Sequence, residues 1–276
     1  MTDSPEPVFA TAGTGHPRRP PPVEPAELSQ PTGAIIVRMS ELEVLVHDVF
    51  GTVVDWRSAV TADGEALGER LGITGVDWQR FADEWRRTYG PSMNRVRTGE
   101  LPWTDLDALH RMGLDALLEE LGIAGRLSES DKVWFNLTWH RLRPWPDSVP
   151  GLTRIKQKFI IATLSNGTVR LLTDMARHCG LPWDTVLGSD LVRHYKPDAE
   201  MYQSVIELLG SGDGGAVMMV AAHTNDLVAA SRHGMQTAYI DRPYEYGAKQ
   251  SRDLGAEHDF TYVATDLEDL ADQLGA

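Results

Sequence analysis

Several residues of this 276-residue chain that could do chemistry lie directly after short apolar runs. The stretch EVLVHDVFGTVVDW, residues 43–56, passes through mostly apolar residues to Asp48 and then breaks at Gly51. A carboxylate at the end of a buried strand is costly unless another group pairs it or uses it. Later segments deliver further polar residues: Ser165 and Asn166 in LSNG, Lys196 in YKPD, and His223 and Asp226 in AAHTND.

These residue types together could form a nucleophile with a cationic partner. An ammonium group close to Asp48 would keep the carboxylate ionised, and Lys196 is a candidate. An ionised, partly desolvated carboxylate beside a fixed cation is a competent nucleophile. A turn at Gly51 would let backbone N–H groups face the site and hold an anion. Helix capping is the alternative role for Ser165, Asn166 and Asp226, and a solvated loop position is the alternative for Lys196.

The elements that must position these residues alternate between strand and helix after residue 147. Buried strands are predicted at 43–48, 159–166, 183–190, 216–222 and 237–241, with helices at 168–180, 198–210, 226–234 and 265–275. Alternating apolar strands and helices predict a parallel sheet that is covered on both faces. Ligands of such sheets bind beyond the carboxyl ends of the strands, where the polar residues lie.

Residues 57–146 show a different spacing of apolar residues. Their apolar residues recur at three- and four-residue spacing in about four runs, and Asp77 and the stretch SESD are typical helix starts. We therefore predict an α/β core domain of residues 34–56 and 147–276, with the all-helical segment 57–146 inserted into it. Residues 1–33 hold eight prolines and are predicted to be a disordered tail.

Composition narrows the class of protein. The net charge of -14 and the pI near 5.0 argue against a nucleic-acid partner, which would require a basic surface. No apolar stretch reaches 18 residues, and the N-terminus does not have the pattern of a secretory signal, so no membrane association is expected. Cys179 is the single cysteine, which favours a reducing compartment. A cytoplasmic location is the expectation.

The motifs HDVFGTVVDW, LSNG, YKPDAEMY and AAHTNDLVAA, in this order, resemble the haloacid dehalogenase superfamily. They are most similar to its type II 2-haloacid dehalogenase branch, over residues 43–270. The resemblance implies a Rossmann-like core with a helical cap domain at 57–146. It also implies that Asp48 displaces halide from a small 2-halo carboxylate and that water then hydrolyses the aspartyl ester.

The resemblance further implies that no metal and no cofactor is needed. Phosphatases of the superfamily carry a second acid two positions after the nucleophile, where this chain has Phe50. They also usually carry an acidic pair in the fourth motif, where Asp226 is the single carboxylate of AAHTND. A phenyl ring cannot shuttle a proton, so a phosphatase would lack its general acid.

Residue roles follow from the same resemblance. Thr52 matches a hydroxyl near the nucleophile, and Lys196 matches its cationic partner. Asp226 matches a carboxylate near the lysine and the hydrolytic water, and Tyr202 matches a tyrosine that braces the site. The residues matched to substrate and halide binding are Phe50, Ser165 for the substrate carboxylate, Asn166 on the halide side and Arg86.

The sequence leaves the roles of two residues open. The halide-binding arginine of the family follows a tryptophan, which favours Arg86 in DEWRRTYG, with Arg87 as the neighbouring alternative. His223 stands where the branch commonly has asparagine, and Ala221 where it has serine. His223 is therefore either a base for the ester-hydrolysing water or a hydrogen-bonding substitute for the amide.

Three functions are compatible with the sequence. The leading interpretation is a metal-independent hydrolase of 2-haloalkanoic acids. The others are a magnesium-dependent phosphatase of the same fold and a catalytically degenerate protein that binds a small carboxylate. Family members are often dimers, so the helical segment could also form a homodimer interface.

Overall fold

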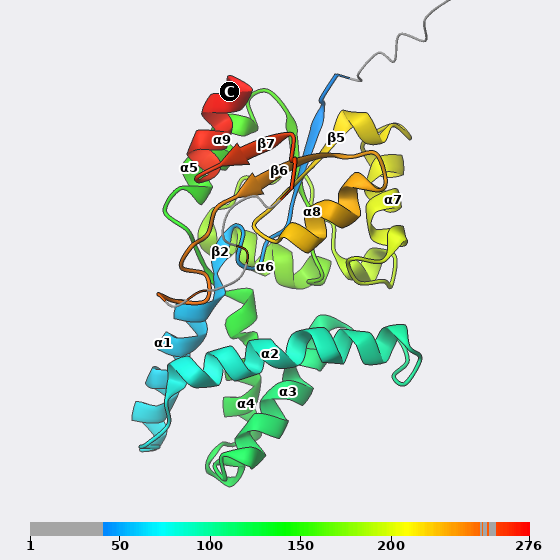
Figure 1. Ribbon diagram of the computed structural model, residues 1–276. Helices are drawn as coiled ribbons and strands as arrows, with labels where there is room; N and C mark the ends of the chain where they lie inside the picture. The colour runs from blue at the N-terminus through cyan, green and yellow to red at the C-terminus, as the bar shows by residue number, and fades with distance from the viewer. Residues whose placement is uncertain (1–40, 249, 251–252, 254–257) are drawn as a thin grey trace, which may run out of the picture. The chain divides into compact units, whose positions relative to one another are not determined.

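The computed structural model describes residues 41–248, 250, 253 and 258–276. Within these residues, five parallel strands form a sheet in the order β4-β1-β5-β6-β7 (Figure 1). The strands are β1 (Val44–His47), β4 (Ile160–Thr163), β5 (Val217–Ala221), β6 (Gln236–Ile240) and β7 (Tyr262–Ala264). The sheet therefore has the predicted α/β class.

The central strand β1 is buried along its whole length. Val46 aligns with Ala162 of β4 on one side and with Met219 of β5 on the other. The chain passes from β1 to β4 on one side and later returns to β5 on the other. The order therefore reverses beside β1, and a crevice beyond the carboxyl end of β1 is the expected ligand site.

Helices cover both faces of the sheet (Figure 1). Leu45 points to the face covered by α5 (Ser148–Ile155), α6 (Val169–Cys179) and α9 (Leu267–Leu274). Val44 and Val46 point to the opposite face, under α7 (Ala199–Leu208) and α8 (Thr224–Ser231). Successive side chains of a strand point to opposite faces, so apolar residues at every position of β1 are satisfied only between two helical layers.

The helical segment consists of α1 (Trp56–Leu71), α2 (Trp78–Arg97), α3 (Leu106–Glu120) and α4 (Glu129–Asn136). Asp77 caps α2, and Ser128 and Asp131 form a capping box at α4, as the sequence predicts. Trp85, Phe135 and Trp139 pack together inside the segment, with Trp85 5.2 Å from Phe135 and 5.4 Å from Trp139 between ring centroids.

Two strands that the sequence does not predict lie where the chain enters and leaves these helices. β2 (Val54–Asp55) pairs antiparallel with β3 (Arg143–Pro144). The domain boundaries at 34–56, 57–146 and 147–276 stay a prediction, and residues 1–33 lie outside the described part of the chain. None of the described helices is both long and apolar enough to cross a membrane.

The predicted strand at 183–190 is wrong. In the described chain this segment makes only isolated bridges to the sheet edge, at Thr185 and Gly188. Side chains take part of the hydrogen bonding that a ladder would use: Asp184 accepts from the backbone of Ile161, and Thr163 bonds both backbone groups of Leu187. The sequence also does not predict α5, which begins at Ser148, two residues after the predicted end of the helical segment at 146.

Candidate active site

A cavity of about 780 Å³ opens beyond the carboxyl ends of β1 and β5. Asp48, Lys196, His223 and Asp226 line it from the side of the sheet. Residues of α2 line it from the helical segment, among them Arg86. The elements that were expected to deliver polar residues to one edge of the sheet therefore meet at one cavity.

Asp48 follows β1 and is 7% exposed. Its Oδ1 accepts a hydrogen bond from Lys196 Nζ at 2.9 Å. Its Oδ2 accepts from Thr52 Oγ1 at 2.9 Å and lies 3.0 Å from His223 Nδ1. Burial alone would raise the pKa of Asp48, but the charges of Lys196 and His223 outweigh burial and hold that pKa well below its usual value. Asp48 is thus a buried carboxylate that stays ionised.

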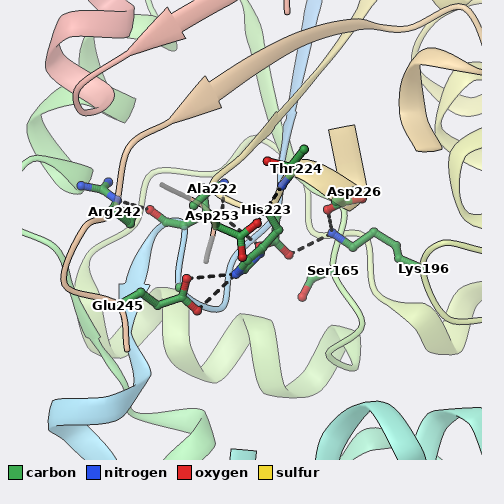
Figure 2. Close-up of polar contacts among 12 residues, drawn as sticks. Ser165, Lys196, Ala222, His223, Thr224, Asp226, Arg242, Glu245 and Asp253 are labelled. Atoms are coloured by element: carbon green, nitrogen blue, oxygen red, sulfur yellow. Dashed lines mark hydrogen bonds and ion pairs between the residues drawn. The ribbon is translucent and has the colours of Figure 1, made fainter. Parts of the chain in front are cut away.

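Lys196 joins two carboxylates. Its Nζ bonds Asp48 and also Asp226, and Figure 2 shows the contact with Asp226. The Tyr202 hydroxyl donates to Asp226 Oδ1 at 2.7 Å. Burial lowers the pKa of Lys196, but Asp226 and Asp48 raise it above the ordinary lysine value, so the ammonium is retained. Burial raises the pKa of Asp226, Lys196 opposes this, and the Asp48 charge adds to the rise. The expected proximity of Asp48, Lys196, Tyr202 and Asp226 is therefore present.

The loop that carries Lys196 is held by the helical segment. Arg97, at the end of α2, donates from Nε to Asp198 Oδ1 at 2.7 Å and from Nη2 to the backbone oxygen of Tyr195 at 3.1 Å. It also bonds the backbone oxygen of Lys196. On the other side, the backbone N–H of Lys196 donates to Asn166 Oδ1 at 2.7 Å. The ammonium is thus fixed from two elements that are distant in sequence.

His223 lies between two carboxylates. Opposite Asp48, its Nε2 is 3.0 Å from Oε2 and 3.2 Å from Oε1 of Glu245 (Figure 2). Burial lowers the pKa of His223, but Glu245 and Asp48 outweigh burial and raise it well above the usual histidine value. Each ring nitrogen of the resulting imidazolium donates a hydrogen bond. In this resting arrangement His223 has no free nitrogen that could accept a proton from water.

Glu245 is a site residue that the sequence reasoning missed. It is 1% exposed, and Trp56 Nε1 donates to its Oε1 at 3.0 Å. Its carboxylate fills the space where a side chain of Gly51 would stand: an added Cβ would lie 2.2 Å from Oε1. Gly51 also has a φ of +88°, so the turn after the nucleophile needs glycine for two reasons.

The loop after β6 places Glu245. Arg242 donates through Nη1 and Nη2 to both carboxylate oxygens of Asp147, at 2.8 and 2.7 Å, and through Nε to the backbone oxygen of Thr52 at 2.9 Å. The rule that polar residues gather after the carboxyl ends of parallel strands applies to 236–240 as well. By this rule the polar residues of DRPYEYG are candidate site residues, although the sequence does not predict the contact between Glu245 and His223.

Arg86 and Arg87 both line the cavity, but most of the Arg87 side chain is exposed to solvent. The Arg86 guanidinium lies over Tyr89 and Trp56, with its Cζ 4.1 and 5.6 Å from the ring centroids. Its buried Nη1 has no hydrogen-bond partner among the described residues. The Arg87 side chain is 70% exposed and pairs with Glu84 at 2.5 Å. Arg86 is therefore the arginine with a donor available for an anion inside the cavity.

Three further predicted residues lie close to this centre. Phe50 is 2% exposed, lines the cavity and packs edge-on against Trp139 at 5.9 Å between centroids. Asn166 also lines the cavity. The Ser165 side chain is fully buried, does not line the cavity, and accepts a hydrogen bond from the backbone N–H of Gly167 at 3.2 Å. Substrate binding by Ser165 stays a prediction.

The residues at the nucleophile do not fit a magnesium ion. The position between the carboxylates of Asp48 and Asp226 is taken by the ammonium of Lys196. Phe50 supplies neither a ligand nor a proton at the place where a second acid would be needed. The groups around Asp48 are those of a carboxylate nucleophile whose charge is neutralised by a lysine.

Comparison with known proteins agrees with this geometry. Residues 42–234 match the family model of haloacid dehalogenase-like hydrolases. The (S)-2-haloacid dehalogenase 4A of Burkholderia cepacia is 27% identical over 214 residues, which are 75% of this chain and 88% of that protein.

Two solved structures have a higher sequence identity to this chain than the Burkholderia cepacia protein has. The L-2-haloacid dehalogenase PA0810 is 46% identical, with a TM-score of 0.80 over 86% of this chain and 99% of the other. The defluorinating L-2-haloacid dehalogenase Rha0230 is 44% identical, with a TM-score of 0.82 over 85% of this chain and 96% of the other.

Proposed function

The chain belongs to the haloacid dehalogenase-like hydrolase family, and from this we propose that it hydrolyses the carbon–halide bond of small 2-haloalkanoic acids without a metal. The observation that carries the proposal is the state of Asp48: a buried carboxylate, kept ionised by Lys196 and His223, at the wall of a cavity. The similar proteins are described as (S)- or L-2-haloacid dehalogenases, so we extend the proposal to the S enantiomer.

In the first step the carboxylate attacks C2 of the substrate. Oδ2 of Asp48 has two donors, Thr52 and His223, whereas Oδ1 has one, Lys196. Oδ1 therefore retains a lone pair for attack, and we assign the new bond to it. The halide leaves as an anion into the cavity, where Arg86 supplies positive charge and a donor, and Asn166 and Phe50 line the wall.

In the second step water attacks Cγ of the Asp48 ester, and the C–O bond to the substrate carbon stays intact. Asp226 lines the cavity, and its raised pKa suits a group that takes the proton of this water. Tyr202 and Lys196 hold Asp226 in place. Splitting one displacement into two easier reactions is nucleophilic catalysis.

Halide release tests the proposal directly. The protein is incubated with (S)-2-chloropropionate, (R)-2-chloropropionate and fluoroacetate, with and without EDTA, and free halide is measured. We expect release from the S enantiomer that EDTA does not reduce. Fluoroacetate is included because a similar structure is described as defluorinating. Phosphate release from p-nitrophenyl phosphate that depends on magnesium would instead identify a phosphatase, and no release of either would identify a binding protein.

Isotope incorporation tests the ester. After a single turnover in heavy-oxygen water, the label should enter the peptide that contains Asp48 and be absent from the hydroxy acid. Label in the hydroxy acid alone would mean that water attacks the substrate carbon directly, and the proposed intermediate would be wrong.

A homodimer remains a proposal for this chain. Large apolar side chains of the helical segment are exposed by 37–46%: Met112, Leu121, Val133, Trp134 and Leu137. They agree with an interface on this segment. Light scattering of the purified protein decides between monomer and dimer.

A further inference from the structure

The two oxygens of Asp48 are held unequally. Thr52 Oγ1 and His223 Nδ1 lie 2.9 and 3.0 Å from Oδ2, within the range that suits donors to a developing oxyanion. Thr52 is itself fixed, because the backbone N–H of Ala222 donates to its Oγ1 at 2.9 Å. If Oδ1 is the attacking atom, Oδ2 becomes the carbonyl oxygen of the ester. Both donors then already face the oxygen that acquires negative charge during hydrolysis.

Ester formation changes the charges around His223. Asp48 loses its negative charge, so one of the two carboxylates that hold the imidazolium disappears. Glu245 remains, with its Oε2 3.0 Å from Nε2 of the ring. The other charged groups nearby are Lys196, on the far side of Asp48, and Arg86, whose charge acts on Glu245. Among the described residues, Glu245 is therefore the anion in contact with His223 throughout the cycle.

We propose that Glu245 is a positioning residue that keeps His223 protonated while the Asp48 ester exists, so that the ring continues to donate to Oδ2. This inference rests on the proposed function. It replaces the alternative in which His223 is the base for water, because a ring that donates from both nitrogens cannot accept a proton.

Hydrolysis of the Asp48 ester conserves atoms and protons. Water oxygen bonds to Cγ, one water proton passes to Asp226, and the carbonyl electron pair moves to Oδ2, where Thr52 and His223 stabilise it. The carbonyl then reforms, the bond from Cγ to Oδ1 breaks, and the departing alkoxide takes the proton from Asp226. Asp48, now a carboxylic acid, releases its proton to solvent and returns to the carboxylate.

The pH dependence of ester decay separates the two roles of His223. A donor must be protonated, so the decay rate should fall as pH rises through the pKa of His223. A base must be deprotonated, so the rate should rise over the same interval. The experiment is a rapid-quench single turnover with (S)-2-chloropropionate, in which chloride is measured and the ester on the Asp48 peptide is followed by mass.

Glu245→Gln is the informative variant, because it keeps the size of the side chain and removes the charge. We expect a chloride burst close to that of the wild type and ester decay slowed by about a hundredfold at pH 8. The loss should shrink as the pH is lowered, because a neutral His223 then takes up a proton from solvent. Glu100→Gln is the matched control, since the Glu100 side chain is 59% exposed and pairs with Arg95 on the surface.

His223→Asn keeps a donor and removes the charge, and it tests whether Glu245 acts through His223. In the His223→Asn background, Glu245→Gln should slow ester decay by less than about threefold, since residues that act as one unit are not additive. Equal effects in both backgrounds would assign Glu245 a purely structural role and overturn the inference.

The remaining outcomes are also decisive. Wild-type decay that rises with pH, or Glu245→Gln decay at the wild-type rate and with the wild-type pH profile, would overturn the inference and leave the proposed function intact. Absence of chloride release by the wild type would overturn the proposed function, and the inference with it.

Discussion

Nζ of Lys196 lies 2.9 Å from Oδ1 of Asp48, although the two residues are 148 positions apart in the chain. Both side chains are less than a tenth exposed. Such a pair is costly to bury unless each charge has a partner, and Asp226 supplies the second carboxylate for the lysine. The consequence is a carboxylate that remains charged in a nearly dry site, which is the condition for nucleophilic attack.

Replacing the nucleophile should abolish dehalogenation. Asp48→Asn keeps the shape of the side chain, but an amide oxygen is a poor nucleophile, so we expect halide release to fall by at least about a thousandfold. The measurement is the rate of chloride release from (S)-2-chloropropionate, with circular dichroism as the check of folding. Asp272→Asn, at a side chain that is 71% exposed, should leave the rate unchanged. Comparable rates in the Asp48 variant would exclude Asp48 as the nucleophile.

Removing the ammonium should damage stability as well as activity. Lys196→Met leaves Asp48 and Asp226 as neighbouring buried carboxylates, and loss of one partner of a buried pair costs about 3 kcal/mol of unfolding free energy. Urea unfolding at pH 7 measures this loss. Lys156→Met is the control, because Lys156 pairs with Asp184 where both side chains are more than a third exposed, and it should cost less than about 1 kcal/mol. Similar losses in the two variants would contradict the prediction.

The two neighbouring arginines of α2 should differ sharply. Arg86→Ala removes a guanidinium at the cavity whose buried Nη1 has no hydrogen-bond partner in the part of the chain that the structure describes, and we expect the rate of the halide burst to fall by about a hundredfold. Arg87→Ala removes a side chain that is 70% exposed and should change that rate by less than about threefold. A larger effect at Arg87 than at Arg86 would reverse the assignment.

His140 should make the stability of the chain depend on pH. Its Nδ1 and Nε2 lie 3.0 Å from Asp174 of α6 and 3.0 Å from Asp107 of α3. Burial lowers the pKa of His140, but the two carboxylates outweigh burial and raise it. The protonated form thus stabilises the folded state. This contribution is complete below the pKa of an unfolded histidine, about 6.5, and is lost as pH rises through the folded-state pKa.

The test for His140 is urea unfolding of the wild type and His140→Gln between pH 5 and 9. We expect the variant to be less stable by about 1.5 kcal/mol at the acidic end, and the difference to shrink at alkaline pH. His178→Gln, at an exposed histidine of α6, is the matched control. A difference that grows with pH would show that His140 is neutral in the folded protein.

Much of this site could be predicted from the sequence alone. The apolar runs that end in Asp48, LSNG and AAHTND predict a parallel sheet with polar residues at one edge. A strand that is buried on both faces must be apolar throughout, so its functional side chains lie only at its end. Phe50, two positions after Asp48, weighs against a phosphatase for a chemical reason that needs no coordinates. The caps at Asp77 and Ser128 are local, and they too were correct.

Only the tertiary structure determined the partners of these groups. Glu245 meets His223 because Arg242 anchors its loop to Asp147, and nothing near Glu245 in the sequence specifies that contact. The segment 183–190 has the composition of a strand, yet it makes only isolated bridges to the sheet edge, and the side chains of Asp184 and Thr163 take part of the hydrogen bonding. Arg86 and Arg87 are adjacent in sequence and both line the cavity, but Arg86 has a buried Nη1 whereas Arg87 is 70% exposed and pairs with Glu84. Residue types fix which chemistry is available, whereas distances between residues remote in sequence fix charge states, because electrostatic interactions depend on separation and burial.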